Sequence, residues 1–246
     1  MDSEHIVKSF DSDLLQIESL IAEMGGLVET QISDATTVLT RRDTVLGKKV
    51  IELDKRVDEI EFEVDAAVVR ILALRQPRAQ DLRAVLVVLK LAGNLERIGD
   101  YAKNICKRTS VLANSKAIGN SSATIKRMGN LVQEMIKDVL DAYVSRDIDT
   151  ADDVRLRDQE VDQMHNALFR ELLTHMMEDP RNITPCMHLL FIAKNVERMG
   201  DHVTSMAEQV HFLVSGKMPD DERPKGDNTS YSSVELNAVN GENNDG

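Results

Sequence analysis

The chain is 246 residues long, and 42% of its residues are apolar although only 3% are aromatic. An aliphatic composition with no Trp and five Pro suits long helices better than strands. Acidic residues number 42 against 30 basic ones, which gives a net charge of -12 with no basic block. Nucleic acid is therefore excluded as an expected partner, because neutralising its phosphates needs clustered Lys or Arg.

Three helices are predicted in the first half of the chain. Apolar residues recur three or four positions apart within 10–41, again within 44–76, and a third time within 77–114. A 3.5-residue period kept over such lengths predicts helices that pack at shallow angles, as they do in bundles.

The second half repeats this plan. We predict helices over 123–145, over 150–177 and, after a Pro-flanked turn at 179–185, over 186–214. The expected fold is all-α, with two tandem, internally repeated antiparallel three-helix bundles and a disordered acidic C-terminal tail. The predicted units are 1–114 for the first bundle, 115–122 for a polar linker, 123–214 for the second bundle and 215–246 for the tail.

Targeting signals and disulfides are not expected. The first residues carry neither a basic segment nor an apolar one, and the longest wholly apolar run near the centre, 84–89, is too short to span a membrane. Cys106 and Cys186 have no spacing typical of a disulfide framework. These features predict a reduced, cytoplasmic protein.

One motif occurs twice. Residues 94–100, Asn-Leu-Glu-Arg-Ile-Gly-Asp, return at 195–201 as Asn-Val-Glu-Arg-Met-Gly-Asp. An offset of 104 aligns the first two predicted helices of each half, and it falls to 103 at Pro77 and Pro180 and to 101 at the motif. A constant offset that slips only at a connection indicates duplication of a whole folding unit of about 100 residues, too long for a short-repeat solenoid.

Each copy carries two pairs of acids spaced four residues apart, one pair on its second helix and one on its third. They are Asp54 and Asp58 with Glu96 and Asp100 in the first copy, and Asp158 and Asp162 with Glu197 and Asp201 in the second. The four acids of the doubled motif, and Asp54 and Asp58, each directly follow a predicted core position. Asp158 and Asp162 stand at the matching places of the second copy, so all eight are expected to flank the packed seam. Like charges at this spacing destabilise a helix by about 0.2–0.5 kcal/mol per pair.

Two interpretations of these acids remain open from chemistry alone. They can form a solvated helix face, with Arg97 or Arg198 as a surface partner. Alternatively, four carboxylates converging from two helices make an all-oxygen site for a hard cation such as Mg²⁺, Mn²⁺, Ca²⁺ or iron. Glu61 and His165, three positions after the second acid of their helices, are candidate additional ligands or ordinary surface residues.

The doubled motif, residues 77–83 and the Asp-x-x-Val-Asp segments beginning at Asp54 and Asp158 resemble the PhoU family of phosphate-regulatory proteins. The resemblance covers about 10–214. It implies two three-helix bundles whose eight acids bind divalent or trivalent metal ions, among them iron, Mn, Mg, Zn or Ca. Two departures allow the sites to differ: Ser205 stands where the first copy has Asn104, and 81–83 has no counterpart.

The same resemblance implies a function. It predicts a metal-binding negative regulator of phosphate uptake and of the phosphate-starvation response, acting as an adapter between the ATPase subunit of the phosphate ABC transporter and the phosphate sensor histidine kinase. No catalytic residues are expected. We expect a homodimer that binds no nucleic acid and meets the inner membrane only through its partners.

Two other classes of function compete with this interpretation. One is a carboxylate-bridged di-metal enzyme in a helical bundle, which normally requires a Glu-x-x-His pair that no helix here supplies in both copies. The other is a purely structural scaffold, which predicts that all eight acids are dispensable. Enzymes in general are disfavoured by the lack of a Gly-rich phosphate loop, of a nucleophile with a spaced His, and of an expected basic pocket for an oxyanion.

Overall fold

A computed structural model describes residues 2–220 of the chain, and within them it contains six α-helices and no strand. The helices are α1 (Asp2–Arg41), α2 (Thr44–Arg75), α3 (Gln80–Val111), α4 (Ser121–Ser145), α5 (Ile148–Glu178) and α6 (Ile183–Ser215), with 3₁₀ turns at η1 (Leu112–Asn114) and η2 (Pro180–Asn182). The predicted all-α, internally repeated fold is confirmed.

The turn between the first two helices of each copy is built twice in the same way. The Asp43 carboxylate accepts hydrogen bonds from the backbone N–H groups of Val45 and Leu46, at 3.0 and 2.9 Å. Its counterpart Asp147 caps α5 through the N–H groups two and three residues further on. Such a cap satisfies two N–H groups that have no partner inside the helix, so α5 begins two residues before the predicted position.

The other helix boundaries differ modestly from the predicted ones. Helix α1 begins at Asp2 rather than near residue 10, and α4 begins at Ser121 rather than 123. Helix α6 begins at Ile183, so Pro185 lies inside its first turn, where the missing N–H of proline costs no hydrogen bond. Of the predicted tail, 221–246 lies outside the described residues.

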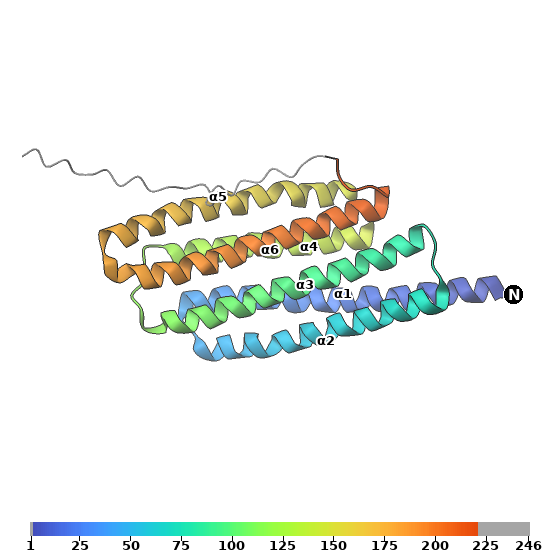
Figure 1. The fold of residues 1–246 in the computed structure, drawn as a ribbon, viewed down its shortest axis with the longest axis horizontal. Helices are drawn as coiled ribbons and strands as arrows, with labels where there is room; N and C mark the ends of the chain where they lie inside the picture. Colours follow the sequence, from blue (N-terminus) through green and yellow to red (C-terminus); the bar gives the residue numbers. More distant parts are fainter. Residues whose placement is uncertain (1, 221–246) are drawn as a thin grey trace, which may run out of the picture.

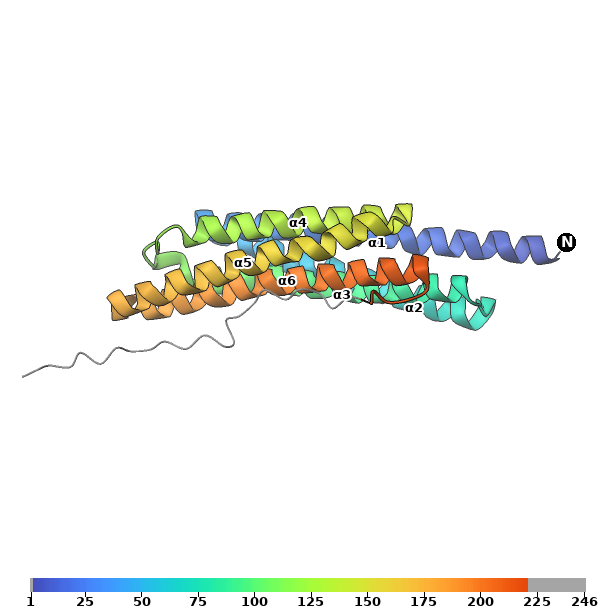
Figure 2. The same cartoon turned by 90° about the horizontal axis from the view of Figure 1, so that it is seen from above.

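The two copies lie against each other along their length (Figure 1). Within each copy every helix contacts the other two, and between the copies α1 packs on α4 while α3 packs on α6. Figure 1 places α2 and α5 on opposite outer sides of this arrangement, and in Figure 2, seen from above, α5 lies in the foreground and α2 behind. None of the described helices has an apolar stretch long enough to cross a membrane.

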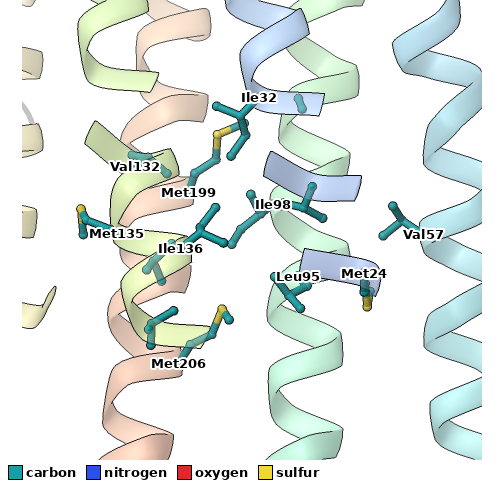
Figure 3. Close-up of a cluster of buried hydrophobic side chains, with 14 of the residues drawn as sticks. Met24, Ile32, Val57, Leu95, Ile98, Val132, Met135, Ile136, Met199 and Met206 are labelled. Carbon is teal, nitrogen blue, oxygen red and sulfur yellow. The ribbon is translucent and has the colours of Figure 1, made fainter. Parts of the chain in front are cut away.

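A single apolar core runs through both copies. Ile32 and Ile98 from the first copy and Ile136 and Met199 from the second are at most 1% exposed, and their side chains point into one shared layer (Figure 3). The irregular connection at 115–120 overlaps the predicted linker, while the division into separate domains stays a prediction. Cys106 and Cys186 are buried free thiols.

Candidate functional site

At the glycine of the repeated motif, the third helix of each copy lies in close contact with a carboxylate of the second helix. A Cβ added to Gly99 would lie 3.2 Å from Asp54 Oδ1, and one added to Gly200 would lie 2.4 Å from Asp158 Oδ1. A carboxylate of the neighbouring helix thus rests on the motif backbone in both copies. Glycine is needed at these positions for this close approach, and the approach brings the two acid pairs together.

In the first copy, Asp54 lies at the bottom of the site and is only 2% exposed. The side chain of Gln31, from α1, donates a hydrogen bond to Asp54 Oδ1 at 3.3 Å. The ammonium of Lys103 forms ion pairs with both Asp54 and Asp100. Burial lowers the pKa of Lys103, but hydrogen bonds to Asp100 and Asp54 outweigh it and leave that pKa above its usual value.

The remaining acids of this site carry more negative charge than one lysine offsets. Burial, and then the charges of Asp100 and Glu61, raise the pKa of Glu96 to about 7. Partial burial and the neighbouring Asp54 raise the pKa of Asp58. The pKa of Glu61 is raised by burial and by nearby acids, Asp58 among them. Glu61 therefore belongs to the cluster rather than to an independent surface.

In the second copy, the equivalent residues are more deeply buried. Asp158, Asp162, His165 and Glu197 are 1%, 2%, 3% and 4% exposed, and Asp201 is half-buried. Lys194 Nζ lies 2.8 Å from Glu197 Oε1. The surface alternatives for these residues are therefore wrong: the acids on α5 and the histidine that follows them do not form a solvated helix face.

The donor chemistry of both sites fits a hard cation, since the acids supply oxygen ligands. In the first copy, burial and then the charges of neighbouring acids raise the pKa of Asp58, Glu61 and Glu96. The side-chain positions in this structure are not arranged for metal coordination. Within residues 12–220, no group of three or more His, Cys, Asp or Glu side chains stands in an arrangement that could hold a metal ion. Cation binding would require these side chains to turn and, in the first copy, Lys103 to leave Asp54.

Two residues of the first site were not identified from the sequence. Lys103 lies three positions after Asp100, a spacing that brings side chains together on a helix, and it could have been found by that spacing. Gln31 is fully buried beside an aliphatic stripe of α1. A lone amide next to such a stripe indicates that a buried polar partner is near, although the sequence does not say which one.

The motifs also meet each other across the interface between α3 and α6. Tyr101 and His202, which occupy equivalent positions in the two copies, have ring centroids 5.7 Å apart. Asn94, the first residue of the first motif, places its Oδ1 2.8 Å from His202 Nδ1. The motif supplies two acids of each site, and Asn94 together with the residue that follows each motif supplies contacts between the copies.

Two copies of a three-helix unit, packed face to face and each carrying acid pairs on its second and third helices, define a duplicated helical-bundle protein with two acidic sites. The family model described as the PhoU domain matches residues 21–109 and again residues 125–210. The chain belongs to the PhoU family.

Relatives and solved structures agree with this assignment. A protein of Caulobacter vibrioides named phosphate-specific transport system accessory protein PhoU homolog is 46% identical over 92% of this chain and 98% of its own. The Escherichia coli K12 accessory protein PhoU is 40% identical over 87% of this chain and 89% of its own. The crystal structure of PhoU from Pseudomonas aeruginosa superposes with a TM-score of 0.81 at 38% identity, covering 85% of this chain and all of that one. These names are those of accessory proteins rather than of enzymes.

Proposed function

We propose that this protein is a non-enzymatic, cytoplasmic negative regulator of phosphate uptake and of the phosphate-starvation response. The observation that carries the proposal is the 46% identity, over 92% of the chain, with an accessory protein of the phosphate-specific transport system. A similar structure from Streptococcus pneumoniae, at a TM-score of 0.79 and 26% identity, is titled a phosphate transport system regulatory protein. The role as an adapter between the transporter ATPase and the sensor kinase is part of this proposal.

A second part of the proposal is that the acids bind divalent or trivalent cations. Asp54, Asp58, Glu96 and Asp100 would hold the cation in the first copy, and Asp158, Asp162, Glu197 and Asp201 in the second. A bound cation would supply the positive charge that the first cluster lacks. The raised pKa values of Asp58, Glu61 and Glu96 support this, because burial and, after it, the charges of neighbouring acids disfavour the ionised carboxylates, and a bound cation would offset both effects.

The regulatory role is tested in a strain from which the gene is deleted. Phosphate-starvation genes should then stay active in phosphate-rich medium, and the wild-type gene should restore repression. Normal repression in the deletion strain would contradict the regulatory proposal. Restoring the gene with all four first-site acids changed to amides asks separately whether that site takes part.

The cation proposal has its own measurement. Titration of Mn²⁺ into protein stripped with chelator should show saturable binding, which should be lost at one site in a Glu96→Gln, Asp100→Asn variant and at the other in a Glu197→Gln, Asp201→Asn variant. Thermal stability should rise with free cation as RT ln(1 + [M]/Kd). A rise of equal size in all variants would show that cations act by general screening, so ionic strength is held fixed.

A further inference from the structure

Besides the acidic sites, a cavity of about 330 Å³ lies between the C-terminal half of α3 and the N-terminal half of α6. None of its six lining residues is acidic, in a chain whose net charge is -12. They are Asn104, Lys107, Arg108, Val111, His188 and Asn195. The sequence did not indicate this grouping of basic side chains, because residues about 80 positions apart come together only in the folded chain.

In the described part of the chain, two polar side chains that line this cavity have a nitrogen without a hydrogen-bond partner. Asn195 Nδ2 and His188 Nδ1 are buried, and neither has a hydrogen-bond partner among the residues that the structure describes. Buried polar nitrogens normally have a partner, so a small turn of either side chain toward an acceptor in the cavity would be favourable. The guanidinium of Arg108 lies 4.2 Å from the centre of the Phe191 ring, a contact that holds its planar face in place at the cavity edge.

The duplication provides an internal comparison. At the offset of 101, the counterparts of Lys107, Arg108 and His188 are Glu208, Gln209 and Val87, so the opposite end of the same interface lacks all three basic groups. There the counterpart of Asn195 is Asn94, whose amide donates to the Lys90 carbonyl and whose oxygen meets His202. The basic cavity is thus particular to one end of the interface and is not a by-product of helix packing.

We propose that this cavity binds a phosphate-class oxyanion, either inorganic phosphate or the phosphate group of a small molecule. Arg108 and Lys107 supply charge, the Asn104 and Asn195 amides supply neutral donors, and His188 donates from Nδ1 in its neutral tautomer. Donors spread over two helices suit an anion with several acceptor oxygens better than a carboxylate, which one Arg can satisfy alone. The site does not rest on the regulatory role or on cation binding.

The test is calorimetric titration of the full chain with inorganic phosphate, and separately with glycerol 3-phosphate, in chelator and at fixed ionic strength. We expect saturable binding at one site. Arg108→Gln and Lys107→Gln should each weaken it by about tenfold, because each removes a charge-assisted hydrogen bond. Lys90→Gln removes an exposed charge from the same helix outside the cavity and should leave binding unchanged. Tighter binding of the ester than of phosphate assigns the site to a phosphorylated small molecule, and the reverse assigns it to inorganic phosphate.

Two further variants distinguish a loss of phosphate binding from a loss of folding. Arg108→Lys retains the charge and should retain most of the binding, while Asn195→Asp keeps the shape but replaces a donor with a negative charge and should abolish it. Thermal melts of each variant show whether the fold is intact. The proposal is overturned if neither ligand binds saturably, if chloride gives the same heat, or if Lys90→Gln weakens binding as much as Arg108→Gln.

Discussion

The first acidic site holds Asp54 between Gln31 and Lys103, whereas the counterparts of those two residues in the second copy are Met135 and Thr204. Lys194, which pairs with Glu197 in the second copy, has Gly93 as its counterpart in the first. All eight acids and both motif glycines are present in both copies, but each copy carries its lysine at a different end of the motif.

The two copies share the contact between a carboxylate and the motif glycine, but they differ in the position of the lysine. A carboxylate resting on a glycine backbone is required by the close approach of two helices, and changing either partner alone leaves a clash or a gap. A lysine reaches the acids through a flexible stem, so it can approach from either end of the motif without altering the helix packing. The two sites therefore share one framework and differ in their internal counter-charge.

The strongest test of this comparison is to separate the copies. A protein ending at residue 120 should fail to show a cooperative helical melt, because Ile32 and Ile98 would lose the apolar partners they share with Ile136 and Met199. Circular dichroism against temperature measures this. Mixing the two halves should restore the transition, and an isolated half that melts like the full chain would show that each copy is an independent domain.

A smaller but still large effect is expected for Lys103→Met in chelator. The variant leaves the buried Asp54 without its ammonium, and because Lys103 remains 21% exposed we expect a loss of about 2–3 kcal/mol in the free energy of unfolding, below the full cost for a buried pair. Urea unfolding with an unchanged m-value measures it. Lys194→Met is the matched control and should cost less, since Lys194 is 35% exposed and its ion pair is therefore more strongly screened by solvent.

The Lys103→Met variant also tests whether the lysine ammonium competes with a cation for the first site. Without the ammonium, a cation no longer competes for Asp54 and Asp100, so Mn²⁺ should bind the first site of Lys103→Met more tightly than that of the wild type. Equal losses of stability in the two lysine variants, with no gain in affinity, would show that the position of the lysine has no consequence.

Alanine in place of a motif glycine should change the free energy of unfolding by less than Lys103→Met does, and by different amounts in the two copies. Gly200→Ala should destabilise by about 2 kcal/mol, because its Cβ would lie 2.4 Å from a carboxylate oxygen that is buried and cannot easily move. Gly99→Ala should cost about 1 kcal/mol, since its nearest atom, 2.9 Å away, ends a longer Gln31 side chain. Gly26→Ala meets nothing within 4 Å and should stabilise by about 0.5–1 kcal/mol through helix propensity.

The sequence predicted the six helices because long aliphatic stripes have a strong period, and it predicted the acid clusters because the repeat marked the same positions twice. It could not predict that the copies share one core, since a stripe does not say which other helix it faces. It also missed the pairing of Lys103 with Asp54 and the cavity beside Arg108. Both depend on contacts between helices at register positions that only the fold determines.

The finest distinction between the two sites is their expected response to pH. The pKa of Glu96 is about 7 in the folded chain and near 4.5 when unfolded, so the folded state holds an extra proton between these values. Stability contributed by that proton is present below about pH 4.5, falls as the pH rises, and is lost above about pH 7. Glu96→Gln removes this dependence and, with 21% of the side chain exposed, should stabilise the protein by about 1 kcal/mol at pH 8 and hardly at all at pH 4.5.

Glu197→Gln is the matched change in the second copy, and it should not stabilise at pH 8, because it removes the carboxylate that Lys194 contacts at 2.8 Å. Unfolding by urea across this pH range, with chelator present throughout, measures both variants. If both substitutions stabilise equally, the internal lysines do not distinguish the sites. If Glu96→Gln destabilises at pH 8, the first cluster is held by attractive ion pairs, and the argument from uncompensated negative charge fails.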